Sequence, residues 1–440
     1  MALAAAPTPV QRLARIGYAT LLRLALPAYA LRLWWRGRAE PRYRFALRER
    51  GGLYREAARG SGWLWVHAVS LGETRAAAAL IDALRGQCPG MRLLLTHGTA
   101  TGREAGASLL RAGDAQAWLP VDTPGAVVRF FDHFRPALGV LIETEVWPHL
   151  LLEAERRAIP MVLANARLSE RSARRGERLT ALLRPAAQSI ALVLAQTQLD
   201  AARLHAAGAR RVEVCGNLKF DVTPDAAGLA RGTAWRQAAG RAVVLAASTR
   251  EGEEAALLAA WQRQAAPRPL LLIVPRHPQR FDAVAALIGA AGLSASRRST
   301  WADVPPPAAA TADVWLGDSI GEMASYFGCA QVALLGGSFE PLGGQNLIEA
   351  AACGCPVLMG PHTFNFAEAA ERALQEGAAQ RVPDITAAVR LAVAMLTPTA
   401  VTSEADSGQT MPSAERALAF VAHHRGAAAR MTEFITALMR

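Results

Sequence analysis

Two series of short apolar runs, separated by stretches with helical periodicity, constrain the fold of this chain most strongly. The first series lies at 63–69, 91–96, 137–143, 159–164, 190–195 and 211–215, and the second at 242–247, 269–274, 313–316, 331–335 and 356–359. Runs of this length alternating with helices are typical of βαβ units, whose parallel strands are buried on both faces. The chain has 440 residues, more than a single core usually supports. We therefore expect an α/β protein with two Rossmann-like domains.

Three polar stretches predict connections within this architecture. Residues 221–234 (DVTPDAAGLARGTA) lie between the two series and predict a linker. Residues 303–312 contain a proline triplet, and residues 397–413 are rich in Ser, Thr and Pro. We expect the last two stretches to be solvated loops that carry no chemistry.

The N-terminal segment predicts contact with an anionic surface. Residues 16–35 are apolar but interrupted by Arg23, Pro27 and Arg32, so no uncharged run reaches the roughly 18–20 residues that a spanning helix needs. Residues 1–60 carry twelve arginines against three glutamates, in a chain of net charge +11. This asymmetry favours a helix that lies on a membrane surface over a nucleic-acid site. A single tilted span and an ordinary helix packed on the domain remain alternatives.

The cysteine pattern argues against disulfide bonds and a structural zinc site. Five cysteines are scattered along the chain, at Cys88, Cys215, Cys329, Cys353 and Cys355, with no C-x-x-C pair and no His/Cys cluster at metal spacing. We therefore expect reduced thiols and no structural zinc.

The stretch WLWVHAVSLGETR at 63–75 joins an apolar run to an Ala-rich segment, which predicts a strand, a tight turn and a helix start. A side chain at such a turn lies at the carboxyl edge of a parallel sheet, where open α/β folds bind ligands. Ser70 and Glu73 also have the S-x-x-E spacing of a capping box, in which each side chain accepts an N–H of the helix start. From this stretch alone, the structural role is favoured over catalysis.

Two glutamates follow the third strand of the first series. Glu143 and Glu145 can face the same side of the sheet edge, because side chains alternate along an extended chain. Two close carboxylates raise one another's pKa unless a cation intervenes. The alternative is that one is exposed and the other caps the next helix.

Other polar side chains follow later strands of this series. Asn165 and Arg167 can bind a carboxylate or a phosphate of a ligand. An asparagine in a local turn and an ordinary surface arginine would account for these two residues equally well. Lys219 is the single lysine of the chain, and a compact ammonium suits one oxyanion or carboxylate. A salt bridge to Asp221 is the alternative.

The second series carries anion-binding signals. Helix starts or cations follow its strands at 248–252, 274–277 and 317–322, where N–H groups and the helix dipole favour phosphate. Residues 336–366 add Gly-Gly turns and a helix start that carries Glu349, without a P-loop or G-x-G-x-x-G pattern. This arrangement predicts a sugar-nucleotide site, with backbone N–H groups on phosphate and a carboxylate on the ribose hydroxyls.

Eight stretches in order carry a resemblance to a known family. They are HAVSLGE (67–73), ETEVWP (143–148), NARLSERS (165–172), GNLKFD (216–221), ASTREGEE (247–254), VPRHPQRF (274–281), LGDSIGEM (316–323) and GPHTFNF (360–366). Together they resemble the 3-deoxy-D-manno-octulosonic acid (Kdo) transferases of lipopolysaccharide synthesis. The resemblance implies a GT-B fold, with two Rossmann-like domains facing a central cleft and an N-terminal membrane-anchoring helix. The expected domains are an anchor at 1–45, an acceptor-binding domain at 46–222 and a CMP-sugar-binding domain at 223–440.

The resemblance also implies roles for individual residues. Glu73 would be the general base, and Glu143 and Lys219 would support the transition state. The implied CMP contacts are Pro275, Arg276, Ile320, Gly321, Glu322, Asn346, Leu347, Ile348 and Glu349. The family loop usually reads GGHN, whereas Gln345 precedes Asn346 here. Glutamine donates and accepts hydrogen bonds but cannot carry a proton, so a role for a protonated histidine is not expected at this position.

The implied activity is inverting transfer of Kdo from CMP-Kdo to a lipid A precursor such as lipid IVA, without a cofactor. No Asp/Glu pair at metal spacing accompanies the predicted phosphate site, so we expect a metal-independent displacement. The expected location is the cytoplasmic side of the inner membrane, on an anionic surface, without a nucleic-acid partner. Alternatives are lipid-A-disaccharide synthesis, UDP-sugar 2-epimerisation, or a non-catalytic nucleotide-binding module at the membrane surface.

Overall fold

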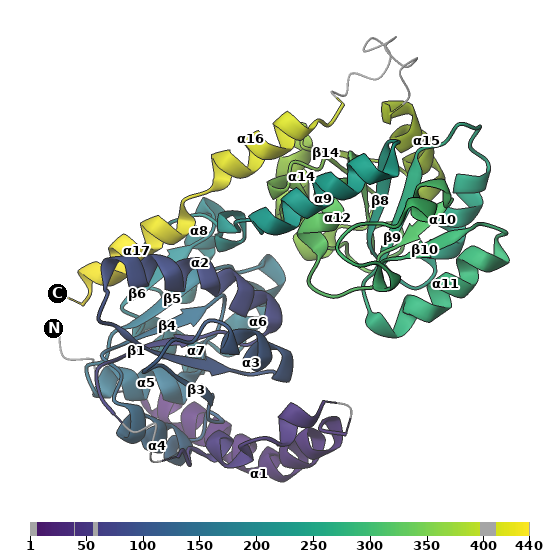
Figure 1. Ribbon diagram of the computed structural model, residues 1–440. Coiled ribbons are helices and arrows are strands. Elements are labelled where there is room, and N and C mark those ends of the chain that lie inside the picture. Colours follow the sequence, from purple (N-terminus) through teal and green to yellow (C-terminus); the bar gives the residue numbers. More distant parts are fainter. Residues whose placement is uncertain (1–6, 39, 56–59, 397–410, 440) are drawn as a thin grey trace. The chain divides into compact units, whose positions relative to one another are not determined.

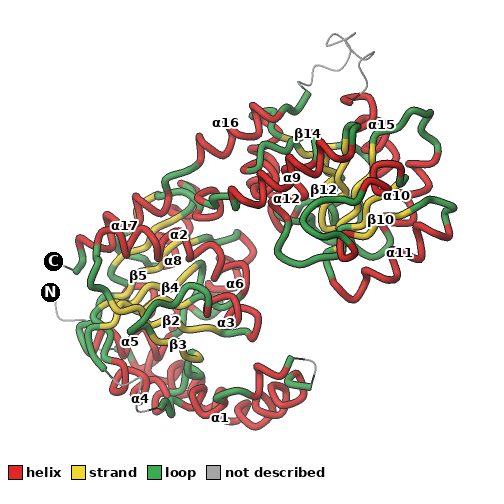
Figure 2. The backbone as a smooth tube through the Cα atoms, viewed as in Figure 1, coloured by secondary structure: helices red, strands yellow, loops and turns green. Residues whose placement is uncertain are grey.

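The computed structural model describes residues 7–38, 40–55, 60–396 and 411–439 (Figure 1). Contacts divide the chain into two compact units. Unit 1 comprises Met1–Asp221 with Arg425–Arg440, and unit 2 comprises Val222–His424. Each unit consists of a parallel sheet with helices on both faces (Figure 2).

Unit 1 contains a seven-stranded sheet with the order β3-β2-β1-β4-β5-β6-β7. Its strands are β1 (Trp63–His67), β2 (Arg92–His97), β3 (Ala115–Trp118), β4 (Leu138–Ile142), β5 (Met161–Ala166), β6 (Leu192–Ala195) and β7 (Val212–Val214). Its helices are α1 (Pro9–Arg36), α2 (Leu71–Gln87), α3 (Ala100–Ala107), α4 (Pro124–Phe134), α5 (Pro148–Arg156), α6 (Glu170–Glu177), α7 (Thr180–Gln188), α8 (Gln198–Ala207) and α17 (Ala427–Ala437), with the 3-10 turns η1 (Pro41–Arg44), η2 (Leu47–Gly51) and η4 (Leu218–Asp221). The six strands expected from the first series are all present, and β3 is an additional edge strand.

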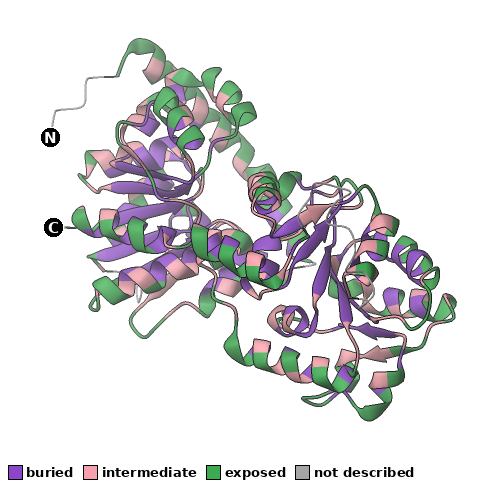
Figure 3. Cartoon of the chain, turned by 90° about the horizontal axis from the view of Figure 1, so that it is seen from above, coloured by how far each residue is buried: buried purple, intermediate pink, exposed green. Residues whose placement is uncertain are grey.

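Successive residues of each strand pack on opposite faces of this sheet. Trp65 of β1 belongs to a core cluster with Phe130 and Phe131 of α4, whereas Val66 belongs to a second cluster with Leu80 of α2. Both faces of the sheet are therefore buried, as parallel sheets require. Figure 3 shows the strands as buried.

Residues 425–440 correct the expected extent of the second domain, 223–440. Helix α17 packs on α2 and η4, and Met431 and Ile435 join the core cluster of Leu80. Asp221 fixes the start of α17, because its carboxylate accepts the N–H groups of Gly426 at 2.6 Å and Ala428 at 2.5 Å. Burial of the apolar face of α17 places the C-terminal segment in unit 1.

Unit 2 contains a second seven-stranded sheet, with the order β10-β11-β9-β8-β12-β13-β14. Its strands are β8 (Val243–Thr249), β9 (Leu270–Pro275), β10 (Ala295–Arg297), β11 (Val314–Leu316), β12 (Val332–Leu335), β13 (Val357–Met359) and β14 (Ala379–Arg381). Its helices are α9 (Ala226–Ala239), α10 (Glu253–Gln262), α11 (Phe281–Ala290), α12 (Met323–Cys329), α13 (Leu347–Ala352), α14 (Ala367–Gln375), α15 (Ile385–Leu396) and α16 (Ala414–His424), with short 3-10 turns η5 (Pro278–Arg280), η6 (Arg298–Thr300), η7 (Pro307–Thr311) and η8 (Phe364–Phe366). All five strands expected from the second series are present, and β10 and β14 are additional edge strands.

The predicted linker at 221–234 is wrong from residue 226 onward. Asp225 caps α9 by accepting N–H groups of its first turn. Gly232 lets α9 approach α12 closely, since a Cβ there would lie 2.1 Å from the carbonyl oxygen of Ser325. The Gly and Ala residues that suggested a linker are therefore the small residues of a tight helix–helix contact.

The two predicted loops have different outcomes. Residues 303–312 include the 3-10 turn η7, and backbone carbonyls of Asp303 and Ala309 accept the indole N–H groups of Trp235 and Trp315, each at 2.8 Å. This stretch is therefore part of the packing, contrary to expectation. Most of the loop predicted at 397–413 lies outside the described residues.

Helix α1 packs on unit 1 through few side chains. Ala19 and Leu33 are buried, and the Tyr18 ring stacks on His149 of α5 with centroids 5.4 Å apart. Eight apolar side chains of this helix are exposed, namely Val10, Leu13, Ile16, Leu21, Leu24, Leu31, Trp34 and Trp35. At 100° per residue they fall within an arc of about 140°. Within the described part of the chain, no helix combines the length and the hydropathy that crossing a bilayer requires.

Candidate functional site

The switch point of the unit 1 sheet brings the predicted carboxylates to one edge. Strand β1 pairs with β2 on one side and with β4 on the other, so the chain leaves β1 and β4 in opposite directions along the carboxyl edge, which is where open α/β sheets bind ligands. Glu73 follows β1, whereas Glu143 and Glu145 follow β4. The sheet thus unites residues that lie 70 or more positions apart in the sequence.

Glu73 lies in the first turn of α2 and takes part in its cap. The Ser70 hydroxyl accepts the N–H of Glu73 at 3.4 Å and donates to Glu73 Oε1 at 3.0 Å, while the N–H of Val69 donates to Glu73 Oε2 at 2.6 Å. The capping role is therefore present in the structure. Burial raises the pKa of Glu73, and the negative charge of Glu143 raises it further. The hydrogen bond from the N–H of Val69 acts in the opposite direction and lowers the pKa.

Glu143 is paired with the single lysine of the chain. Lys219 Nζ lies 3.5 Å from Glu143 Oε1, and both side chains are about one third exposed or less. Glu143 has φ +64°, a left-handed conformation that turns the chain sharply at the end of β4. The alternative partner of Lys219, Asp221, is instead occupied with the start of α17.

Glu145 is the third carboxylate at this edge. Burial raises its pKa to about 7, and the charges of Glu73 and Glu143 contribute to the rise. The carboxylates therefore influence one another, as close like charges must.

A buried amide network positions Lys219. Asn165 Oδ1 accepts the N–H of Leu218, and Asn217 Oδ1 accepts the N–H of Lys219, both at 3.0 Å. Gln196 joins them, since it accepts from Asn217 Nδ2 at 3.0 Å and donates to the carbonyl of Asn165 at 2.9 Å. Asn165 is fully buried, so it shapes the turn that carries Lys219. Arg167, by contrast, is exposed.

The corresponding edge of unit 2 is organised by a carboxylate that sequence analysis missed. Glu253, 2% exposed, accepts the N–H groups of Arg250 and Gly337 at 2.8 Å and of Phe339 at 3.2 Å. Burial raises the pKa of Glu253, although these three hydrogen bonds act in the opposite direction. Gly336 completes the contact, because a Cβ there would lie 2.2 Å from the carbonyl oxygen of Ser248. The loops after β8 and β12, which flank the switch point of this sheet, are thereby joined.

The predicted CMP contacts after β9 and β12 have unequal access to solvent. Arg276 is exposed and its Nε donates to Gln345 Oε1 at 3.1 Å, so the glutamine at the family's histidine position orients this arginine. Asn346 caps α13 through the N–H of Ile348 at 3.1 Å. Pro275, Leu347 and Ile348 are buried, the last two in the core, so these two can present only backbone atoms to a ligand.

The remaining predicted contacts surround the start of α12 and the first turn of α13. Ile320 is 78% exposed and Gly321 has φ +85°. The Glu322 carboxylate pairs with Arg298 at 2.9 Å and accepts the Ser319 hydroxyl. Burial opposes ionisation of Glu322, but these bonds lower its pKa. Glu349 is half-buried in the first turn of α13.

Comparisons with known proteins identify relatives of this chain. A family model described as 3-deoxy-D-manno-octulosonic-acid transferase matches residues 46–222. The 3-deoxy-D-manno-octulosonic acid transferase of Bordetella pertussis is 48% identical over 377 residues, which cover 83% of this chain and 85% of the relative. That of Haemophilus influenzae is 35% identical and covers 80% and 84%. The solved structure of UDP-GlcNAc 2-epimerase from Neisseria meningitidis aligns with a TM-score of 0.53 at 14% identity, over 86% of this chain and 99% of that one.

Two doubly wound units, each with polar residues gathered at the switch point of its sheet, define the class as a two-domain α/β protein resembling GT-B glycosyltransferases. Within that class the sequence relationships are specific. The chain belongs to the 3-deoxy-D-manno-octulosonic acid transferase family.

Two parts of the site were not assigned from the sequence. Glu253 was part of a recognised stretch, but only the fold shows that the loops of Gly337 and Phe339 converge on it. Helix α6 carries Arg171, Arg174 and Arg175, and Arg178 follows its end; these arginines line an open hollow of about 330 Å³, and none of the eight residues of α6 is buried. The arginine count in 170–178 was a signal that could have marked it.

Proposed function

We propose that this protein transfers Kdo from CMP-Kdo to a hydroxyl of a lipid A precursor, in lipopolysaccharide core biosynthesis. The observation that carries the proposal is the group of Glu73, Glu143, Glu145 and Lys219 at the switch point of unit 1. Such a group offers a base beside a paired carboxylate and ammonium, where an acceptor hydroxyl would bind. The chain is also related over most of its length to a 3-deoxy-D-manno-octulosonic acid transferase.

Glu73 is the proposed general base. A sugar hydroxyl is a poor nucleophile, and a positioned base typically contributes about 10²- to 10⁴-fold to its attack. The carboxylate takes the hydroxyl proton as the hydroxyl oxygen bonds to the anomeric carbon. The bond from that carbon to the phosphate oxygen breaks, and CMP leaves with the electron pair. Burial and the charge of Glu143 raise the pKa of Glu73, which strengthens it as a base.

Lys219 and Glu143 stabilise the charges around this step. The ammonium lies 3.5 Å from Glu143 and limits the repulsion among the carboxylates. The two roles of Glu73, cap and base, are alternatives in time in this proposal. Glu73 leaves Ser70 and Val69 when the acceptor hydroxyl offers it a proton.

Unit 2 is the proposed site of the CMP moiety. Arg276, held by Gln345, supplies a cation for the phosphate, and the turn at Gly321 supplies backbone N–H groups. Asn346 and Glu349 begin α13, where a carboxylate can accept the ribose hydroxyls. Leu347 and Ile348 contribute through the backbone, consistent with their burial.

The exposed apolar face of α1 supports a membrane-surface location, on the cytoplasmic side of the inner membrane. Trp34 and Trp35 belong to this face, and the Arg38 and Arg44 guanidinium groups lie 5.0 and 4.9 Å from the ring of Trp34. Aromatic rings beside cations suit the headgroup region of an anionic bilayer. The arginines of α6 provide further positive charge in unit 1 for the phosphates of the acceptor.

Release of CMP tests the proposed function. Purified protein incubated with CMP-Kdo and lipid IVA in detergent should release CMP, and omission of the lipid should abolish the release. Turnover of UDP-GlcNAc, or CMP release that is independent of lipid, would contradict the proposal. Flotation with vesicles containing anionic lipid tests the location, and replacement of Leu24 and Leu31 by Gln should reduce flotation while CMP release from detergent-dispersed substrate is retained.

A further inference from the structure

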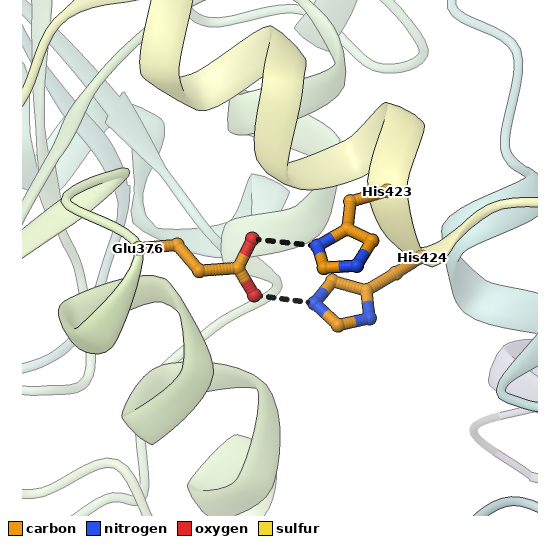
Figure 4. Close-up of side chains that lie close together, drawn as sticks. All are labelled: Glu376, His423 and His424. Atoms are coloured by element: carbon orange, nitrogen blue, oxygen red, sulfur yellow. Dashed lines mark hydrogen bonds and ion pairs between the residues drawn. The ribbon is translucent and has the colours of Figure 1, made fainter.

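A second cluster of polar side chains lies in unit 2, and none of its residues belongs to the sites described above. Glu376 follows the end of α14, and His423 and His424 are the last two residues of α16 (Figure 4). Glu376 Oε1 lies 2.7 Å from His424 Nε2, and Glu376 Oε2 lies 3.4 Å from His423 Nδ1. One ligand atom of each residue lies within 4.8 Å of those of the other two. Two imidazoles thus face one carboxylate.

We propose that Glu376, His423 and His424 form a binding site for Zn²⁺. Zinc accepts two histidine nitrogens and one carboxylate oxygen, and a water completes four-coordination. At Zn–N and Zn–O lengths near 2.1 Å, tetrahedral ligand atoms are about 3.4 Å apart. His423 Nδ1 already has this separation from Glu376 Oε2, at 3.4 Å. His424 Nε2 lies 2.7 Å from the other oxygen, Oε1, so this ring must shift for both imidazoles to share a zinc ion with Oε2.

The neighbouring charges define what must change when the metal binds. Arg372 Nη1 lies 3.3 Å from His424 Nδ1, and because arginine only donates, this nitrogen accepts and Nε2 carries the proton. For Nε2 to bind zinc in a neutral imidazole, the proton moves to Nδ1 as Arg372 withdraws from that nitrogen. Arg372 retains Glu368 at 2.8 Å, so its charge stays paired.

The cluster is accessible to an ion. The side chain of His423 is 73% exposed, those of Glu376 and His424 are 29% and 15% exposed, and Glu376 also lines an open cavity of about 710 Å³. Two sides of the site are therefore supported by α14 and α16, and one is open to water. The expected absence of a structural zinc site rested on sequence spacing, which missed this cluster because Glu376 precedes His423 by 47 residues.

The site would connect two segments that the sequence keeps apart. Zinc would join the turn after α14 to the last turn of α16, directly before the chain passes from unit 2 to unit 1 at Arg425. We therefore expect the metal to stabilise α16, so that its amide hydrogens exchange more slowly in the presence of zinc.

Titration of the untagged full-length protein with ZnCl₂, followed by calorimetry, tests the site. We expect one ion per chain. Removal of one ligand, in His424→Ala or Glu376→Gln, should weaken binding by more than the roughly 10- to 100-fold that loss of a supporting partner costs. His205→Ala, which removes a histidine of unit 1, is the matched control and should bind as the wild type does.

Co²⁺ substitution identifies the ligands. We expect visible absorption of a four-coordinate ion without a thiolate charge-transfer band, because the five cysteines lie outside the cluster. If His424→Ala fails to fold, His423→Gln, at a largely exposed side chain, provides the same test. Absence of binding by the wild type, binding unchanged in the folded ligand variants, or a thiolate band would overturn the proposal.

Discussion

Replacement of Glu253 by glutamine tests how the loops after β8 and β12 are held together. The carboxylate accepts three backbone N–H groups, two at Oε2 and one at Oε1, and is 2% exposed. The amide oxygen of glutamine can keep the two bonds to Arg250 and Gly337. The amide nitrogen then faces the N–H of Phe339, so one charge-assisted bond is lost and a buried donor is left unsatisfied.

Each of these two effects costs about 1–3 kcal/mol, so we expect Glu253→Gln to lower the free energy of unfolding of unit 2 by about 2–6 kcal/mol. Urea denaturation, followed by circular dichroism with all native tryptophans kept, measures this loss. Glu251→Gln makes the same chemical change at a side chain that is 93% exposed and should stay within about 0.5 kcal/mol of the parent. Equal midpoints for the two variants would refute this view of Glu253.

Three further predictions follow from single contacts. Gly232→Ala should destabilise unit 2, since its Cβ would lie 2.1 Å from a backbone oxygen, whereas Gly289→Ala, with nothing within 4 Å, should not; thermal denaturation compares them. Burial raises the pKa of Glu145 to about 7, and its ionisation adds negative charge beside Glu73, so kcat/KM should rise through about pH 7 and Glu145→Gln should remove that inflection. Burial lowers the pKa of His67 from 6.5 to about 3, so its contribution to stability is present above pH 6.5 and is lost as the pH falls toward 3. The non-titrating His67→Asn should therefore lose less stability than the wild type between pH 7 and 4 in urea denaturation, and an equal loss would contradict this.

The strands were predictable because their burial is continuous. Runs such as 190–195 and 242–247 are apolar at every position, as a sheet covered on both faces demands. The three strands that were not predicted, β3, β10 and β14, are edge strands with partly exposed residues, and their sequences lack that signal. Helix α9 was taken for a linker because Gly228 and Gly232, which serve close packing, also occur in flexible segments.

The site was predictable in part for a different reason. Glu73 and Glu143 each follow a recognisable strand, and the carboxyl edge of a parallel sheet is where such residues gather. The partner of Lys219 was not predictable from spacing, because Glu143 lies 76 residues before it and the nearer Asp221 offered a local alternative. The roles of Glu253 and of the cluster of Glu376, His423 and His424 depend on side chains that only the tertiary structure brings together.

The mass of the lipid product made by the wild type and by Glu73→Gln tests the central claim most directly. With CMP-Kdo and lipid IVA, the wild type should yield a lipid whose mass rises by one or more Kdo residues. Glu73→Gln cannot accept the hydroxyl proton and should yield this product at least about 100-fold more slowly, while it still binds CMP with the affinity of the wild type. Unchanged product formation by a folded Glu73→Gln protein, or a wild-type lipid of unaltered mass, would contradict the account.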